Sequence, residues 1–166
     1  MLIIFSGLPG VGKSTIAREL AGEIGAVLVR IDSIEQAIRA WGIGDMEDLG
    51  YRVAYAMALD NLRLGLTVVA DSVNPIALTR EAWRAVAREA GVASLDVEVV
   101  CSDADEHRRR AECRPQDIPG HVHPTWAEVT GRDYHPWADE RVLIDTAVQD
   151  VAASVAQIRK ALAIAS

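Results

Sequence analysis

Lysine, cysteine and long apolar runs are all scarce in this chain of 166 residues. Its two cysteines, Cys101 and Cys113, lack the spacing of metal ligands, so we expect two free thiols and no disulfide framework. No apolar stretch approaches the roughly 20 residues that a helix needs to cross a bilayer. The apolar start, residues 1–5, is too short for a signal peptide and carries no basic residue. We therefore expect a soluble, cytoplasmic protein.

Positive charge is also in short supply, because the net charge is −7. A surface of that sign repels phosphodiester backbones, which disfavours extended nucleic-acid binding. A local basic groove for the end of a strand stays open as an alternative. Half of the residues are hydrophobic and a quarter are charged, a composition that excludes a disordered chain. The length fits a single domain, residues 1–166.

What the sequence does contain is an alternation of short apolar runs and longer helical patterns, which predicts βαβ units and a parallel sheet. The predicted strands are residues 2–5, 27–31, 66–71, 95–101 and 141–145. The predicted helices are residues 13–24, 33–41, 47–64, 75–91, 104–113 and 148–163, with a short one at the capping box of residues 125–128. Asn74 is expected to cap the helix that opens with Pro75, and Asp103 the next helix. The prediction is an α/β fold, a three-layer α/β/α sandwich around five parallel strands.

The most specific motif is Gly-Leu-Pro-Gly-Val-Gly-Lys-Ser, residues 7–14, between the first strand and the first helix. Its glycines allow backbone N–H groups to surround phosphate oxygens at the positive end of the helix. Lys13 is expected to reach the β- and γ-phosphates of ATP, Ser14 to ligate Mg²⁺ and Thr15 to contact the α-phosphate. A lysine is not a compositional accident in a chain with two lysines and fifteen arginines. The predicted nucleotide-binding residues are Gly7, Pro9, Gly10, Val11, Gly12, Lys13, Ser14 and Thr15.

The motif of residues 7–14 is a P-loop, a phosphate-binding loop that also occurs in GTPases and in motor ATPases. The chain has no Asn-Lys-x-Asp motif to select guanine, and it is too short for a motor module with a helical lid domain. With these two classes excluded, the P-loop NTPase class that remains is the group of small kinases that resemble nucleoside-monophosphate kinases.

Two aspartates are predicted to end strands beside the P-loop, where such folds bind ligands. Asp32 can orient an acceptor hydroxyl and take its proton during phosphoryl transfer. The alternative is that Asp32 only caps the helix starting at Ser33. Asp71 closes the third strand in the Walker B pattern and is expected to accept hydrogen bonds from Mg²⁺-bound water or from Ser14. Its alternative is an ordinary turn residue at the end of a strand.

Further candidate residues lie along the same rim. Asn74 and Arg80 are candidate substrate contacts with Asp32 and Asp71, although a helix cap explains Asn74 equally well. Arg110 and Arg114 are four residues apart and share a helix face. From a mobile lid, about residues 103–124, they are expected to neutralise the transferred phosphoryl group. The alternative for them is a solvated basic face paired with neighbouring glutamates. Thr146, after the last strand, is expected near the adenine.

These motifs together resemble the AAA-33-type family of small P-loop kinases, which includes chloramphenicol phosphotransferase, the kinase domain of polynucleotide kinase, and gluconate and adenylylsulfate kinases. Residues 29–37 are similar to the chloramphenicol phosphotransferase segment that carries its catalytic aspartate, which implies that Asp32 is the base. Residues 69–75 and 100–110 resemble a bacterial branch of kinases. The resemblance to the group covers nearly the whole chain and implies ATP and Mg²⁺ as cofactors. The resemblance to members of known substrate is confined to short motifs.

One departure from that family bears on the acceptor. Polynucleotide kinases carry an arginine one turn after the catalytic aspartate to hold the acceptor phosphate, and Glu35 stands there in this chain. A carboxylate at that position repels a phosphorylated acceptor and favours a neutral or cationic metabolite or antibiotic. Arg39, Arg52 or Arg80 offers a compensating charge, so the question stays open. The acceptor-binding region is expected at about residues 33–65.

Three functional hypotheses follow from the sequence. The leading one is an ATP-dependent kinase that phosphorylates a hydroxyl of a small molecule. The alternatives are a 5′-hydroxyl polynucleotide kinase and an ATP-binding regulatory module without an acceptor. His121, His123 and His135 have no cysteine partners, so zinc is not expected.

Overall fold

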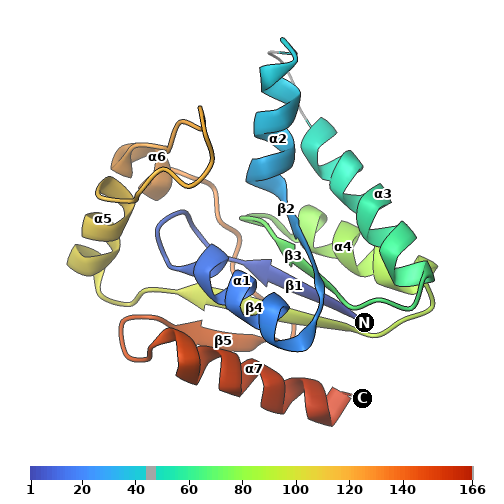
Figure 1. Ribbon diagram of the computed structural model, residues 1–166. Coiled ribbons are helices and arrows are strands. Elements are labelled where there is room, and N and C mark those ends of the chain that lie inside the picture. The colour runs from blue at the N-terminus through green and yellow to red at the C-terminus, as the bar shows by residue number, and fades with distance from the viewer. Residues whose placement is uncertain (44–47, 166) are drawn as a thin grey trace.

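The computed structural model describes residues 1–43 and 48–165, and within them the strands form one five-stranded sheet. All neighbouring strands run parallel, in the order β2-β3-β1-β4-β5 (Figure 1). The strands are β1 Leu2–Ser6, β2 Val27–Arg30, β3 Val68–Asp71, β4 Ser94–Val100 and β5 Val142–Asp145. Because parallel strands end at the same edge of a sheet, the loops after β1, β2 and β3 meet there.

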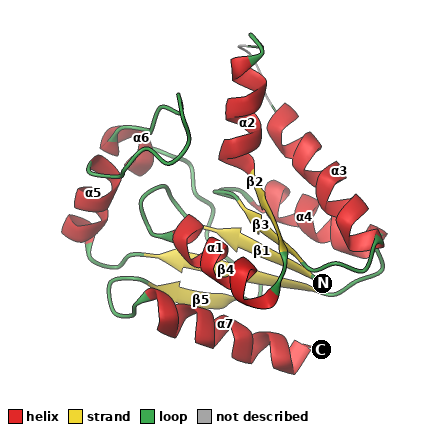
Figure 2. Cartoon of the chain, viewed as in Figure 1, coloured by secondary structure: helices red, strands yellow, loops and turns green. Residues whose placement is uncertain are grey.

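Helices cover both faces of the sheet (Figure 2). They are α1 Lys13–Ile24, α2 Ile31–Ala40, α3 Leu49–Arg63, α4 Ala77–Glu89, α5 Ala104–Glu112, α6 Trp126–Thr130 and α7 Val151–Ala165. Ile3 and Phe5 of β1 point into the core with α1 and α7, whereas Leu2 and Ile4 point into the core with α3 and α4. A strand buried on both faces needs apolar residues throughout, which explains the continuous apolar run at the start of the chain.

Two groups of helices lie beyond the ends of the strands, on either side of the loops there (Figure 1). On one side lies α2, with α3 beside it. On the other side stand α5, α6 and the loop that joins them. We call residues 103–124 the lid, and the P-loop lies between the lid and α2.

The start of α2 differs from the sequence prediction. The second strand ends at Arg30, and Ile31 and Asp32 already belong to the first turn of α2. Asp32 is therefore inside the helix, so the alternative that it caps a helix starting at Ser33 is wrong. A carboxylate in the first turn is stabilised by the positive end of the helix dipole.

Asn74 does not cap a helix either, because α4 begins at Ala77 with Ile76 as its N-cap. Asn74 has a φ of 44°, in the left-handed region that asparagine tolerates better than most residues. Its side-chain nitrogen donates a hydrogen bond to the Phe5 carbonyl oxygen at 3.0 Å. The loop after β3 is thereby fastened to the end of β1, and this tertiary contact overrides the local Asn-Pro pattern.

Two other helix starts follow the prediction. The Asp103 side chain accepts hydrogen bonds from the N–H groups of Asp105 and Glu106, and Thr125 and Glu128 form the expected capping box. The helix predicted at residues 47–64 is α3, although its first predicted residue, Glu47, lies outside the described residues.

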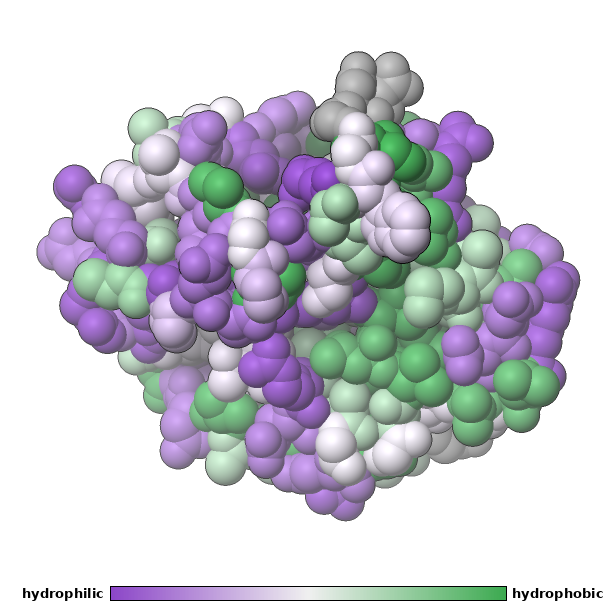
Figure 3. Space-filling view, turned by 45° about the horizontal axis from the view of Figure 1, so that its top comes forward, coloured by the Kyte–Doolittle hydropathy of each residue, from purple (hydrophilic) through white to green (hydrophobic). Residues whose placement is uncertain are grey.

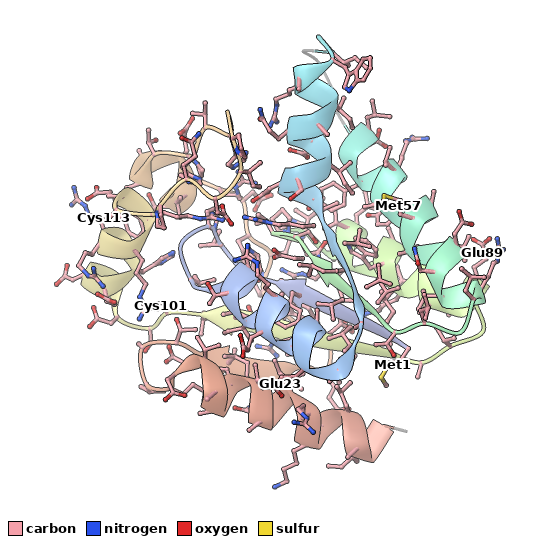
Figure 4. The ribbon with its side chains drawn as sticks, in the orientation of Figure 1. Met1, Glu23, Met57, Glu89, Cys101 and Cys113 are labelled. Carbon is pink, nitrogen blue, oxygen red and sulfur yellow. The ribbon has the colours of Figure 1, made fainter. Side chains whose placement is uncertain are left out.

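Both cysteines are free thiols, as the sequence predicts. Cys101 lies just after β4 and Cys113 at the end of α5 (Figure 4). No helix in the described part of the chain is long and apolar enough to span a membrane.

Candidate active site

The P-loop fits tightly between its neighbours, and its glycines are required for this. Gly7 has a φ of 144°, and a side chain on it would collide with the Val99 carbonyl oxygen. Gly10 has a φ of 89°, and a Cβ there would lie 2.9 Å from the Cβ of Ala111 on α5. His107, also on α5, hydrogen bonds through Nε2 to the Pro9 carbonyl oxygen at 2.9 Å. The lid helix is therefore packed directly on the P-loop, a contact that the sequence did not reveal.

A cavity of about 310 Å³ opens between the P-loop and the lid. We call it the nucleotide cavity, and it is lined by Gly10, Gly12, Lys13, Ser14, Thr15, Arg109, Arg110, Cys113, Arg114 and Pro115. Four of these described lining residues are cations and none is a carboxylate. A cavity with this charge, at the N-terminus of α1, suits the phosphates of a nucleotide.

Arg110 joins the lid to the loop after β5. Its Nη1 donates to the Thr146 hydroxyl at 2.9 Å and its Nη2 to the Thr146 carbonyl oxygen at 3.2 Å. Its Nε also donates to Glu106 at 2.7 Å, so the predicted pairing with a glutamate and the predicted place at the site coexist. A side cavity of about 300 Å³, lined in part by Gly12, Arg110 and Thr146, extends from this contact. Thr146 therefore lines a cavity beside the P-loop, and its contact with the base of a nucleotide stays a prediction.

A larger cavity of about 580 Å³ lies between α2 and the lid. We call it the acceptor cavity, and it is lined by Pro9, Lys13, Ile31, Asp32, Glu35, Gln36, Arg39, Tyr51, Val73, Arg114, Gly120, His121, Val122, His123, Pro124, Glu128 and Arg132. In Figure 3, which brings this edge of the sheet forward, hydrophilic residues predominate on the lid side. Lys13 and Arg114 line both this cavity and the nucleotide cavity, so the two cavities adjoin at these cations.

Asp71 is buried beside the P-loop lysine. Its Oδ1 lies 3.7 Å from Lys13 Nζ, and its Oδ2 lies 3.5 Å from Nε of Arg30, its neighbour in the sheet. Both Asp71 Oδ2 and Arg30 Nε are buried without a hydrogen-bond partner among the described residues. A buried carboxylate beside Lys13 is compatible with the predicted service to Mg²⁺.

Arg30 and Asp117 are residues of the site that the sequence analysis missed. Arg30 is buried, and its Nη1 lies 2.7 Å from Oδ2 of Asp117 in the lid. Its Nη2 lies 3.9 Å from Oδ2 of Asp32. Arg18 of α1 also donates to Asp117, at 3.0 Å. The hydrogen bond from Arg30 is the largest cause that holds the pKa of Asp117 well below its ordinary value. The only sequence signal was a charged residue at the end of an apolar strand.

Glu35, which the sequence analysis singled out, is half-buried in the acceptor cavity. It accepts a hydrogen bond from Arg39 at 3.2 Å, and burial raises its pKa. Gly50 of α3 leaves the space for it, because a Cβ on Gly50 would lie 2.5 Å from Glu35 Cγ. Its charge is thus matched within α2 itself.

Asn74 and Arg80, predicted to contact substrate, line neither cavity. Asn74 is fully buried, and Arg80 is 2% exposed. The guanidinium of Arg80 donates to the carbonyl oxygens of Asn74, Pro75 and His135 at 2.8 to 3.0 Å. The structure assigns both residues a packing role in place of a substrate contact.

The three histidines considered as zinc ligands are divided between two places. His121 and His123 line the acceptor cavity with their rings 5.2 Å apart, and burial lowers the pKa of His121. His135 lies instead beside Asp133, at 3.3 Å. Among the described residues no group of three or more histidine, cysteine or acidic side chains is arranged to hold a metal ion.

Comparisons with known proteins agree with this architecture. The AAA_33 family model, an AAA domain, matches residues 2–129. A search of curated proteins gives no match. Among solved structures, Kti12 of Chaetomium thermophilum in complex with ADP-AlF3 superposes with a TM-score of 0.73 at 21% identity, over 99% of this chain and 98% of that chain.

Two further solved structures are similar. The APS kinase CysC of Mycobacterium tuberculosis, in complex with AMPPNP and APS, gives a TM-score of 0.66 at 17% identity, over 98% of this chain and 96% of that chain. A gluconokinase of Sinorhizobium meliloti 1021 gives 0.64 at 21% identity, over 99% and 96%. At such identities the likeness concerns the fold, and it confirms the predicted α/β sandwich of the P-loop type.

Proposed function

The chain belongs to the AAA_33 family, and on that premise we propose that it is an ATP-dependent kinase, which transfers the γ-phosphoryl group of ATP to a hydroxyl of a small molecule. The observation that carries the proposal is that the nucleotide and acceptor cavities adjoin at Lys13 and Arg114. Phosphoryl transfer needs a donor and an acceptor that meet in line at cationic groups. Two of the solved structures with this fold carry the name of a kinase.

The residues of the nucleotide cavity suit ATP with Mg²⁺. The P-loop amides and Lys13 would hold the phosphates, and Arg110 and Thr146 flank the side cavity proposed for the base. The Ser14 hydroxyl and the Asp71 carboxylate beside Lys13 would serve Mg²⁺. The metal would neutralise charge on the phosphate oxygens when bound.

Asp32 is proposed as the base. It lies in the acceptor cavity, at the end of α2 that faces the P-loop lysine. Asp32 would hold the acceptor hydroxyl and receive its proton as the hydroxyl oxygen bonds to the γ-phosphorus. The bond from that phosphorus to the oxygen of the β-phosphate breaks, and ADP leaves. Lys13, Arg114 and Arg110 would stabilise the charge on the transferred group.

The test compares Asp32→Asn with Asp60→Asn, an exposed aspartate of α3 used as the matched control. Asp32→Asn should bind Mg-AMPPNP with a Kd within about twofold of wild type and lose phosphoryl transfer by roughly 10²–10⁴-fold, because only proton transfer is removed. Normal transfer by Asp32→Asn would show that the base is misassigned. A wild-type protein that binds Mg-ATP but phosphorylates no hydroxyl compound would favour the regulatory module.

A further inference from the structure

The acceptor cavity has a charge balance opposite to that of the chain. The chain as a whole carries −7, yet the cavity is lined by four cations and three carboxylates. The cations are Lys13, Arg39, Arg114 and Arg132, and the carboxylates are Asp32, Glu35 and Glu128. A cleft that inverts the sign of the surrounding surface concentrates anions.

Two of the three carboxylates are already matched inside the protein. Glu35 accepts a hydrogen bond from Arg39. Glu128 accepts hydrogen bonds from the Thr125 N–H group at 2.7 Å and from its hydroxyl at 2.8 Å, which closes the capping box of α6. The third, Asp32, is the proposed base and faces the acceptor hydroxyl. Glu35 and Glu128 are therefore both engaged by groups of the protein, Glu128 through neutral donors.

Two of the four cations, Arg132 and Arg114, are less well matched. Arg132, just after α6, makes no hydrogen bond or ion pair with the described residues, and it acts only through its charge, on Glu35, Glu128 and Tyr51. Arg114 has one partner, Asp117, at the long distance of 4.0 Å. A guanidinium is a planar fork that binds carboxylate, phosphate or sulfate groups at two points. An uncommitted one on a cavity wall is a binding group for an anion.

The cavity also separates its anion-binding end from its base. Arg39 follows Asp32 by seven residues in α2, which places its backbone roughly 10 Å further along the helix axis. Arg132 lines the same cavity, and its charge acts on Glu35, which follows Asp32 by three residues in α2. This arrangement suits a molecule whose reacting hydroxyl and anionic group lie several atoms apart.

We propose that the acceptor carries an anionic group and that Arg132 binds that group. This inference rests on the proposed kinase function and names the class of its acceptor. It replaces the sequence argument for a neutral or cationic acceptor, because the Glu35 charge on which that argument depends is matched by Arg39.

The experiment uses pairs of compounds that differ only in the anion or nearly so: gluconate and glucitol, glycerol 3-phosphate and glycerol, adenylyl sulfate and adenosine. Glucosamine serves as a cationic comparison. Each is added to the full chain with Mg-AMPPNP for thermal shift, and with Mg-ATP for phosphoryl transfer. The carboxylate, phosphate and sulfate members then distinguish the sources of negative charge.

We expect an anionic member to raise the Tm and to be phosphorylated in preference to its neutral partner. Arg132→Gln should raise the KM of that acceptor tenfold or more, with the KM of Mg-ATP within twofold of wild type. The matched control is Arg63→Gln, an exposed arginine of α3 paired with Glu89 away from both cavities, and it should change neither constant.

The outcomes separate this inference from the proposed function. If a neutral or cationic compound is phosphorylated, and Arg132→Gln does not change that transfer, the inference of an anionic acceptor is wrong and the proposed kinase function stands. Binding of an anionic compound that depends on Arg132, with no transfer to any compound, would support the anion site and count against the kinase. If no anionic compound binds while Mg-AMPPNP binds normally, the inference is wrong.

Discussion

Arg30 and Asp117 form an ion pair at two points, with Nη1 2.7 Å from Oδ2 and Nη2 3.3 Å from Oδ1. Arg30 ends β2 at the edge of the sheet, and Asp117 belongs to the lid. The same guanidinium lies 3.5 Å from Asp71 and 3.9 Å from Asp32. One buried cation therefore fastens the lid and holds both aspartates of the proposed site.

Loss of this pair should loosen the lid selectively. Asp117→Asn keeps the shape of the side chain but leaves Arg30 without its main partner, which should cost about 2 kcal/mol of unfolding free energy. For a chain of this size the Tm should fall by roughly 4–8 °C. Amide hydrogen exchange of residues 118–124 should accelerate at least tenfold, measured by mass spectrometry.

The nucleotide cavity provides an internal control for that variant. Its lid helix is held by His107 on Pro9 and by Arg110 on Thr146, contacts that do not involve Asp117, and the pair of Arg114 with Asp117 is long, at 4.0 Å. The Kd for Mg-AMPPNP should therefore change by less than about threefold. Equal acceleration of exchange in β1 and β4 would show global destabilisation and refute a role specific to the lid.

Acid should remove the same pair at low pH. Arg30 and Arg18 keep the pKa of Asp117 below its ordinary value of 3.8. A depressed pKa means that the contribution is complete above the ordinary pKa and is lost as pH falls through the lower, folded one. The Tm difference between wild type and Asp117→Asn should be constant from pH 7 to about pH 5 and should shrink only below about pH 4. Thermal unfolding of both proteins across that range is the measurement, and a difference that disappears near pH 6 would contradict it.

The sequence predicted the parts of this fold that depend on neighbouring residues. The run at residues 2–5, the glycines of the P-loop and the caps at Asp103 and Thr125 are local signals, and the structure confirms those elements. The ion pair of Arg30 with Asp117 joins residues 87 positions apart. Neither partner has a spacing rule, so only the folded arrangement reveals it.

The helix cap predicted at Asn74 failed for the same reason, a contact between distant residues. Asn-Pro before an apolar pattern is typical of a helix start, but the local pattern carries no information about the Phe5 carbonyl oxygen. Once that contact forms, the loop continues to Ile76 before α4 begins. The prediction failed where a tertiary hydrogen bond outweighs a local preference.

For Arg80 the sequence prediction and the structure differ most. The sequence places it among substrate contacts, whereas the structure stacks it over the Trp137 ring at 4.1 Å and pairs it with backbone carbonyl oxygens on two separate loops. Arg80→Met fills similar space but leaves those buried carbonyl groups without a donor, which should cost about 3 kcal/mol. The Tm should fall by roughly 6–12 °C.

Activity then decides between the two interpretations. Well below its Tm, Arg80→Met should retain the KM of wild type for the acceptor, because the side chain lines neither cavity. Arg63→Met removes an exposed arginine and should leave the Tm within about 2 °C of wild type. A normal Tm combined with a raised acceptor KM would restore Arg80 as a substrate contact. A lowered Tm with an unchanged KM would establish that this buried guanidinium shapes the rim by holding the loops after β3 and before β5 together.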